Sequence, residues 1–490
     1  MEWTTEQRYK RIEEVTPEEL QALAKQVNES PWRQTFHIQP VTGLLNDPNG
    51  FSFYNGEYHL FYQWFPLGPV HGLKYWYHTK STDLVHWENV GIAIHPNAEI
   101  DSHGAYSGSA IEHENNLYLM YTGNTRDENW VRHPFQNIAV MNEDGVITKC
   151  DKPVIDHVPD GYTDHFRDPK VWKENDTFYA VIGAQRINET GCIVLYSSPD
   201  MKNWTFEGEV KNDLGSFGYM WECPDYFMVN GQGVLVFSPQ GIAPNGDHYH
   251  NIYQSGYVIG ELNVHGNTMT HGEFSELDRG FDFYAPQSME APDGRRIMVG
   301  WMGLPEVAYP TDQYGWAHCL TLPREMTIEN GKLMQRPVRE LKLKRGVKME
   351  VHDVLQNETK TFDSFSGTVF ELMTEFHNVD AESFGIEFRV SETEKTVLLY
   401  DAVQKKVVLD RTHSGTAVGT EFGTVRQCAL DAEQVKFHLF VDTSSVEVFV
   451  NDGEEVFTSR IFPGSESTGI RFFANDGNAS YSAVKWTIGG

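Results

Sequence analysis

The chain has 490 residues, of which 40% are hydrophobic, and its formal net charge is −30 at pH 7. A chain of this length and composition buries large cores and is typical of a soluble protein with two or more domains. The strong negative charge excludes nucleic acid and anionic membrane surfaces as general partners, so an anionic ligand would need a local basic pocket.

Residues 1–33 are predicted to form a helical extension. Their first half is charged and lacks the apolar core of a secretory signal. Thr16, Pro17 and Glu19 are typical of an N-cap, a first helical proline and a capping-box glutamate, which predicts a short docking helix. No run reaches the roughly 18 apolar residues of a membrane span. The five cysteines lack zinc-site spacing and favour a reducing compartment, so we expect a cytoplasmic protein.

Five turn dipeptides recur along the next 300 residues, and each precedes a short apolar and aromatic run such as YHLFYQW or LYLMYTG. The turns begin at Asn55, Asn115, Asn175, Asn230 and Asp293. Successive turns lie 60, 60, 55 and 63 residues apart, and such self-similarity marks solenoids and propellers. With about four strand-like runs per unit, the pattern predicts a five-bladed β-propeller over residues 34–336.

Polar residues recur at one position ahead of four of the five turns. Counting back eight residues from the turns reaches Asp47, Ser107, Arg167, Glu222 and Ala285, and Asp168 follows one step later. Propeller blades stand radially around a central channel, so equivalent positions on the innermost strands lie at the same end of that channel. The repeat therefore predicts that three carboxylates from three blades occupy equivalent places around one funnel.

The repeat ends near residue 336. A basic stretch, residues 337–348, is predicted to be a linker, and residues 349–490 then change character. Runs such as FGIEFRV, VKFHLFV and VEVFV alternate apolar with polar residues between Asp-Gly, Asn-Asp and Ser-Gly turns, which predicts a β-sandwich. The expected fold class is therefore all-β, with a short N-terminal helix, a five-bladed propeller and a C-terminal sandwich.

The surroundings of the three acids predict different protonation states. Asp47 lies in the turn NDPNG beside Asn46, whose hydrogen bonds would keep its pKa low and suit a nucleophile. Glu222 has apolar neighbours that would raise its pKa and suit a proton donor. Such carboxyls about 5 to 5.5 Å apart hydrolyse glycosides with retention, and wider pairs invert. Arg167 would hold Asp168 ionised, either to grip substrate hydroxyls or as a structural ion pair.

Several motifs, in order along the chain, resemble those of glycoside hydrolase family 32, the invertases, fructanases and sucrose-6-phosphate hydrolases. NDPNG at 46–50, FRDPKVW at 166–172 and WECPD at 221–225 are similar to the three acid motifs of that family. The resemblance extends to SGSA at 107–110 and GWMGLPE at 300–306. It covers almost the whole chain, because that family joins a five-bladed propeller to a β-sandwich.

The resemblance implies that Asp47 is the nucleophile of a covalent fructosyl-enzyme, Glu222 the acid/base and Asp168 the stabiliser of the transition state. It also implies that no metal or other cofactor takes part. The positions similar to those that contact the fructosyl unit are Asn46, Gln63, Tyr106, Ser107 and Arg167. Tyr284 and Trp301 either add contacts to the sugar or belong to the core.

Within the family, the chain looks most similar to bacterial intracellular sucrose-6-phosphate hydrolases. Secreted relatives often carry a tryptophan at the position of His71 and a glycine at that of Tyr77, so the leaving-group side of the pocket differs here. A phosphorylated substrate needs a cationic clamp for its dianion. The loop candidates, which are more commonly solvated surface charges, are Lys74, Arg126, Arg132 and His133.

The preferred hypothesis is a retaining β-fructofuranosidase that hydrolyses sucrose 6-phosphate, sucrose or both. The alternatives are a fructan-degrading exo-fructosidase, a fructosyltransferase that uses the same covalent intermediate, and a glycan-binding propeller without catalysis. A pure binding protein would not require all three acids. The expected partner is a small disaccharide, with neither nucleic acid nor membrane, and the sequence leaves the oligomeric state open.

Overall fold

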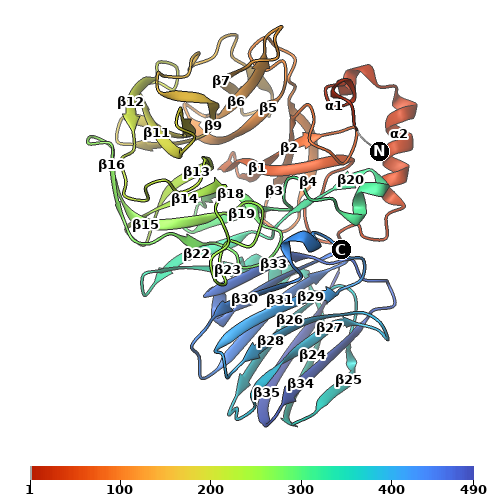
Figure 1. Ribbon diagram of the computed structural model, residues 1–490. Helices are drawn as coiled ribbons and strands as arrows, with labels where there is room; N and C mark the ends of the chain where they lie inside the picture. Colours follow the sequence, from red (N-terminus) through yellow and green to blue (C-terminus); the bar gives the residue numbers. More distant parts are fainter. Residues whose placement is uncertain (1–2, 490) are drawn as a thin grey trace.

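Strands dominate the fold, as the alternating apolar runs predict. The computed structural model describes residues 3–489 (Figure 1). The strands of residues 43–337, coloured from red through green, form five sheets. The strands from residue 345 on, coloured cyan to blue, form two further sheets beside them. The predicted all-β class, a five-bladed propeller followed by a sandwich, is confirmed. No helix in the described range is long and apolar enough to cross a membrane.

The N-terminal segment contains the α-helices of the described chain, α1 (Thr5–Arg8) and α2 (Pro17–Asn28), and the 3-10 turn η1 (Ile12–Glu14). Helix α2 begins as predicted, because the Thr16 hydroxyl accepts from the Glu19 N–H and the Glu19 carboxylate accepts from the Thr16 N–H. The helix docks on the propeller, where its Gln26 side chain donates to the Gln313 carbonyl. Helix α1 was not predicted, since four residues are too few for a periodic signal.

The propeller is built from five blades. Counted from the centre outward, blade I contains β1 (Gly43–Tyr54), β2 (Glu57–Phe65), β3 (Tyr75–Ser81) and β4 (Glu88–Ile94); blade II contains β5 (Ala105–His113), β6 (Asn116–Arg126), β7 (Arg132–Met141) and β8 (Ile147–Lys149); blade III contains β9 (Tyr162–Glu174), β10 (Thr177–Arg186), β11 (Gly191–Ser198) and β12 (Thr205–Glu209); blade IV contains β13 (Met220–Val229), β14 (Gln232–Gln240), β15 (Gly256–Asn263) and β16 (Thr268–His271); and blade V contains β18 (Tyr284–Glu290), β19 (Arg296–Met302), β22 (Arg324–Glu329) and β23 (Lys332–Pro337). Three short strands extend these sheets, β17 (Ser275–Glu276) beside β15, β20 (Trp316–Ala317) beside β1 and β21 (Cys319–Leu320) beside β19.

The five predicted turns join the first and second strands of the blades. Their first residue is asparagine in four blades, with positive φ at Asn55, Asn115, Asn175 and Asn230, and Gly294 takes the positive φ in blade V. Asparagine and glycine are the residues that adopt this left-handed conformation most readily, which explains why the sequence repeat was visible at these positions.

Hydrogen bonds between neighbouring inner strands close the ring. In each case a backbone N–H of one inner strand donates to a side chain of the inner strand that precedes it around the ring. The pairs, donor first, are Gly108 to Asn49 (3.1 Å), Val171 to Ser109 (3.0 Å), Cys223 to Asp168 (3.0 Å), Ser288 to Asp225 (2.6 Å) and Phe51 to Gln287 (2.9 Å). Because these side chains are mostly buried, the bonds fix the blades relative to one another at the centre of the ring.

The sandwich consists of two six-stranded antiparallel sheets. One contains β24 (Arg345–Gln356), β35 (Asn478–Ile488), β26 (Phe370–His377), β31 (Val435–Asp442), β32 (Ser445–Val450) and β33 (Glu455–Arg460), and the other contains β25 (Thr359–Ser366), β34 (Gly469–Asn475), β27 (Ser383–Val390), β28 (Lys395–Asp401), β29 (Lys406–His413) and β30 (Val425–Ala429). The remaining 3-10 turns are η2 (Pro310–Tyr314), η3 (Arg339–Lys344), η4 (Thr420–Phe422) and η5 (Asn451–Gly453). Strand β24 begins at Arg345, so a strand occupies part of the stretch that we expected to be a linker.

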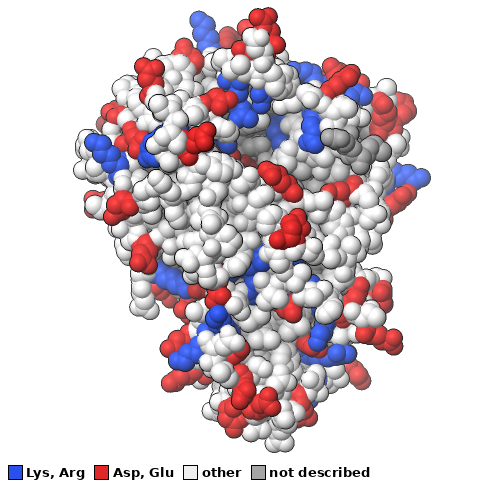
Figure 2. Space-filling model, viewed as in Figure 1, with Lys and Arg blue, Asp and Glu red and all other residues white. Residues whose placement is uncertain are grey.

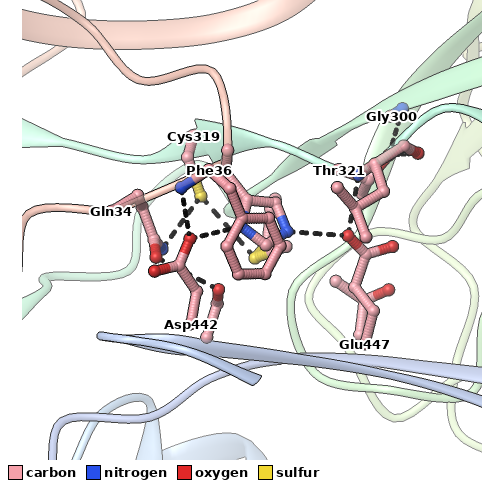
Figure 3. A network of polar contacts seen from close by, with 12 residues as sticks. Gln34, Phe36, Gly300, Cys319, Thr321, Asp442 and Glu447 are labelled. Atoms are coloured by element: carbon pink, nitrogen blue, oxygen red, sulfur yellow. Dashed lines mark hydrogen bonds and ion pairs between the residues drawn. The ribbon is translucent and has the colours of Figure 1, made fainter. Parts of the chain in front are cut away.

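A buried network of charges joins the propeller to the sandwich (Figure 3). Figure 3 shows Asp442 and Glu447 approaching from the sandwich, Gln34 and Phe36 from the chain ahead of blade I, and Thr321 from blade V. His37 lies between the two acids, with Nδ1 2.8 Å from the Asp442 carboxylate and Nε2 3.0 Å from that of Glu447. All three side chains are fully buried. Burial lowers the pKa of His37, but the hydrogen bonds and charges of both acids outweigh it and raise that pKa to about 9.

The same network continues through Arg324 of blade V. Its guanidinium bonds the Glu447 carboxylate at 2.6 Å and the Asp278 carboxylate at 3.1 Å, and all three side chains are buried. Asp278 in turn accepts from the backbone and the hydroxyl of Thr458 on β33. Since buried charges are tolerated only when they are paired and hydrogen-bonded, the two domains must stay together for these groups to remain satisfied.

The His37 contact predicts a loss of stability at alkaline pH. Because the folded pKa of about 9 lies above the ordinary value of 6.5, the contribution of His37 is complete below pH 6.5 and is lost as the pH rises through 9. The shift corresponds to on the order of 3 kcal/mol in the free energy of unfolding. We expect His37→Gln to be destabilised at pH 6 and to lose this pH dependence in denaturant unfolding between pH 6 and 9.

The control is His157→Gln, because the His157 side chain is 77% exposed and, among residues 3–489, forms an ion pair only with its neighbour Asp156. This variant should keep the wild-type pH dependence. A His37→Gln protein whose stability falls between pH 6 and 9 as steeply as that of the wild type would contradict the assignment.

Candidate active site

A cavity of about 690 Å³ opens at the end of the channel where the inner strands begin. Its lining includes the three predicted acids, Asp47 from β1, Asp168 from β9 and Glu222 from β13. Figure 2 shows a hollow on the propeller half of the molecule, with Lys and Arg side chains (blue) at its edge. Seven of the eight predicted site residues line this cavity, and the buried Ser107 hydrogen-bonds to one of them, Asp47.

A β-bulge lies beside each of these side chains. The register of β1, β5, β9, β13 and β18 slips against the second strand of its blade at the position where the polar residues stand. Bulges bend a strand and re-aim its side chains, and they also tolerate a proline that cannot donate to the ladder. Proline follows Asp47, Asp168, Cys223 and Ala285, so the bulge explains the Asp-Pro and Cys-Pro pairs in the sequence.

The bulges correct the predicted alignment of the acids. Asp168, Cys223 and Ala285 share a positive φ of 67°, 48° and 47° and each precedes a proline. Cys223 is therefore the blade IV equivalent of Asp168, and Glu222 stands one residue earlier, in the place of Arg167. The expectation that all three carboxylates occupy equivalent positions is wrong for Glu222, although its side chain still reaches the same cavity.

Asp47 is held by three polar side chains. Its carboxylate accepts from the Ser107 hydroxyl at 2.5 Å, from the Asn46 amide at 3.1 Å and from the Gln63 amide at 3.3 Å. The predicted low pKa of Asp47 is wrong. Burial raises the pKa of this carboxyl and the charge of Glu222 raises it further, against the hydrogen bonds from Ser107 and Asn46. The hydrogen bonds therefore fix the orientation of the group more than they favour its ionised form.

Asp168 accepts a hydrogen bond from the Cys223 N–H at 3.0 Å. The Cys223 sulfur lies 3.6 Å from the Asp168 carboxylate and 3.6 Å from that of Asp47, so one thiol bridges the two acids. Burial raises the pKa of Asp168 to about 7, and the charges of Glu222 and Asp47 add to the effect of burial. The expectation that Arg167 holds Asp168 ionised is wrong, because the favourable charge of Arg167 does not outweigh these opposing effects.

Arg167 instead forms an ion pair with Glu222. Its guanidinium donates to one carboxylate oxygen at 2.6 and 3.0 Å. The other oxygen accepts from the Gln240 amide at 2.7 Å and from the Tyr284 hydroxyl at 2.6 Å. The expected apolar setting of Glu222 is therefore wrong, since its apolar neighbour Trp221 turns away and stacks on Phe237. The carboxylate is oriented by polar contacts on both oxygens.

The remaining candidates are divided between the cavity and the surface. Tyr106, Tyr284 and Trp301 line the cavity, so the two aromatics whose role was open belong to the site. Lys74 and Arg132 also line it. Arg126 packs over the Trp130 ring, 5.1 Å from its centroid, and the exposed His133 pairs with Asp127 at 3.2 Å.

Comparison with known proteins agrees with this geometry. The sequence model of the "Glycosyl hydrolases family 32 N-terminal domain" matches residues 37–337, and that of the family 32 C-terminal domain matches residues 340–488. The chain belongs to glycosyl hydrolase family 32. It is thus a glycosidase by family, and the motifs that predicted this membership are the ones that build the cavity.

Relatives match this family 32 enzyme over its whole length. The chain is 49% identical to a sucrose-6-phosphate hydrolase of Staphylococcus xylosus, over 100% of this chain and 99% of that protein. A solved sucrose-6-phosphate hydrolase of Lactobacillus gasseri is similar with a TM-score of 0.94 at 39% identity, covering 99% of both chains. A Bombyx mori family 32 β-fructofuranosidase, solved in complex with sucrose, has a TM-score of 0.82 at 32% identity and covers 96% of this chain and 97% of that one.

Some residues of the family 32 site were not predicted. Gln240 ends the strand paired with β13, and only the ladder between the two strands places it opposite Met220, beside the acid. Arg8 and Tyr9 come from the unpredicted helix α1 and the residue after it, yet they line the cavity. Cys223 carried a usable signal, because the Cys-Pro pair repeats the Asp-Pro pair of Asp168.

The raised pKa of Asp168 predicts that the ionised form of this side chain lowers the free energy of unfolding. The folded pKa of about 7 lies above the ordinary 3.8, so the contribution of Asp168 is favourable below pH 3.8 and is lost as the pH rises through 7. Asparagine carries no charge and tolerates positive φ. We expect Asp168→Asn to be more stable than the wild type by about 1 to 4 kcal/mol at pH 8, with little difference at pH 4 and a loss of activity.

Denaturant unfolding at pH 4, 6 and 8 measures this difference, and the exposed Asp176→Asn serves as the matched control. The control should not change stability with pH. A destabilised Asp168→Asn at pH 8 would show that the carboxylate makes a net favourable contribution.

Proposed function

We propose that the protein is a retaining β-fructofuranosidase that hydrolyses sucrose 6-phosphate and sucrose and releases fructose. The observation that carries the proposal is the convergence of Asp47, Asp168 and Glu222 in one cavity of about 690 Å³, which is a suitable size for a disaccharide. It is supported by relatives named sucrose-6-phosphate hydrolase that match the whole chain. Catalysis is assigned to residues 34–336 and a supporting role to the sandwich.

The reaction that we assign to this site is a double displacement. Asp47 attacks the anomeric carbon of the fructosyl unit, while Glu222 gives a proton to the glycosidic oxygen, so that the glucosyl unit leaves and a fructosyl ester forms. Glu222 then takes a proton from water, which attacks the same carbon and frees fructose and Asp47. Asp168 holds fructose hydroxyls as positive charge develops on the ring. Ser107, Asn46 and Gln63 hold Asp47 in line, and this alignment lowers the barrier to attack.

The proposal also includes the cellular compartment of the enzyme. All five cysteines are free thiols in the structure. Thiols persist in a reducing compartment, and phosphorylated sugars are substrates found inside cells, so we assign the enzyme to the cytoplasm.

Replacing the two reacting acids tests the chemistry. We expect Asp47→Ala and Glu222→Gln to lower kcat on sucrose 6-phosphate by at least about 10³-fold, because the first loses the nucleophile and the second the proton donor. Reducing-sugar release measures the rate, and sugar binding by calorimetry shows that the cavity is intact. Binding by the wild-type protein without any sugar release would favour the glycan-binding alternative.

Retention has its own test. In the presence of methanol, the fructosyl intermediate should be captured as methyl β-fructofuranoside, because two inversions at the anomeric carbon restore the β configuration. Nuclear magnetic resonance identifies the anomer. The methyl α anomer would contradict a covalent intermediate, because it would arise from a single displacement in which methanol attacks the substrate directly.

The substrate order separates the proposal from the fructan and transfer alternatives. We expect kcat/KM for sucrose 6-phosphate to be at least equal to that for sucrose, and both to exceed that for a short inulin. A large preference for inulin would identify a fructan exo-hydrolase. Oligosaccharide products at high sucrose, in place of free fructose, would identify a transferase.

A further inference from the structure

Several positive side chains in the cavity have no ion-pair partner among the described residues. Four Lys and Arg side chains line it, and within residues 3–489 only that of Arg167 forms an ion pair, with Glu222. The other three, which we call the cationic wall, are Arg8, Lys74 and Arg132. In a chain with 69 acidic and 39 basic residues, three unpaired cations in one cavity require a reason.

Lys74 is the most unusual of the three. It lies just ahead of β3 with 4% of its surface exposed, and its ammonium group is buried without a hydrogen-bond partner among the described residues. Burial lowers the pKa of Lys74 to about 7, and neighbouring Arg8 lowers it further, against the charge of Asp47. An unpaired buried ammonium is costly, and a bound anion would supply the partner that Lys74 lacks.

Arg132 and Arg8 approach the same cavity from other elements. Arg132 begins β7 in blade II, and its buried Nε also lacks a hydrogen-bond partner within the described chain. Arg8 ends α1, where one guanidinium nitrogen donates to the His71 carbonyl at 2.7 Å and keeps the side chain at the cavity. The cationic wall thus combines blade I, blade II and the N-terminal segment.

A dianion needs such a wall. The phosphate of sucrose 6-phosphate carries about −1.5 to −2 charges at pH 7. Five carboxyl groups line the same cavity, those of Asp47, Asp168, Glu222, Glu306 and Asp312. Without compensation, those acids would repel the substrate. Arginine binds phosphate through paired N–H donors and lysine through a point charge, and both contacts gain strength in a buried site.

The geometry points to Lys74, Arg132 and Arg8 as the phosphate-binding site for the glucosyl 6-phosphate of the substrate. This inference rests on the proposed function, because it names the part of the site that selects the phosphorylated form. The fructosyl unit lies against the three acids, and the phosphate at the far end of the disaccharide contacts the cationic wall. The site adds no step to the reaction, and it acts by binding alone.

The experiment compares kcat/KM for sucrose 6-phosphate and sucrose in the full-length protein. Lys74→Met keeps the side-chain length without the charge, and Arg132→Gln and Arg8→Gln remove the guanidinium groups. We expect the ratio of the two kcat/KM values to fall by about 30-fold in Lys74→Met and by about 10-fold in each arginine variant. Lys80→Met is the matched control, since Lys80 lies on the neighbouring β3 and pairs with Glu57 at 3.1 Å.

A second readout uses the product as a probe. Glucose 6-phosphate should inhibit sucrose hydrolysis by the wild type more strongly than glucose does, and this difference should shrink in the three variants. It should persist in Lys80→Met. The arginine variants keep the test decisive if Lys74→Met does not fold.

The outcomes separate this inference from the proposed function. A wild type that hydrolyses neither sugar would overturn the proposed function and the inference with it. If the wild type prefers sucrose 6-phosphate and the variants keep the same preference, only the assignment of the cationic wall to the phosphate would be overturned. An equal loss of kcat/KM on both sugars in Lys74→Met would also overturn the inference. It would show that the charge of Lys74 acts on Asp47 and not on the phosphate.

Discussion

The β-bulge at the start of each inner strand is the constraint on which the active site depends. A regular strand would send successive side chains to opposite faces, so Glu222, which stands one residue ahead of the position equivalent to Asp168, would face away from the other acids. The bulge re-aims them toward the channel, and the side-chain bridges between inner strands lock that orientation. One of these bridges runs from the Cys223 N–H to the Asp168 carboxylate, so a bond that closes the ring also positions an acid of the site.

Charge is distributed in two different ways in this acidic protein. At the boundary between the propeller and the sandwich, His37 and Arg324 are matched by Asp442, Glu447 and Asp278, and all of these groups are buried. In the cavity, acids stand close together and their burial raises the pKa of Asp47 and Asp168. Separating the two domains would leave the matched charges buried without partners or exposed singly, so the network holds the domains together. The burial of the acids in the cavity, by contrast, costs free energy at the place where a substrate binds.

The sequence predicted the fold well because its signals were local and repeated. Turns at Asn55 and its four equivalents require residues that accept positive φ, and this requirement recurs once per blade. The acids were found for the same reason, since the turns set the distance to them. The roles assigned to these acids stay predictions, but their gathering in one cavity is seen in the structure.

The parts that the sequence missed depend on contacts between distant segments. Neighbours in the chain predicted an apolar setting for Glu222 and a low pKa for Asp47, whereas side chains alternate along a strand and the surroundings come from other blades. Gln240, 18 residues from Glu222, supplies one hydrogen bond, and Tyr284, 62 residues away, supplies another. Such hydrogen-bond partners do not recur at a fixed distance along the sequence, so the spacing of residues could not predict the pKa values and charges of the site.

The first helical turn of the chain has a consequence for the handling of this protein. Trp3 packs edge-on against Phe65 with ring centroids 6.0 Å apart, and Arg8 and Tyr9 line the cavity. A truncation or substitution that displaces this segment therefore removes part of the cavity wall, although the segment lies outside the five blades. Kinetic constants measured on a protein shortened within this segment would describe an incomplete cavity.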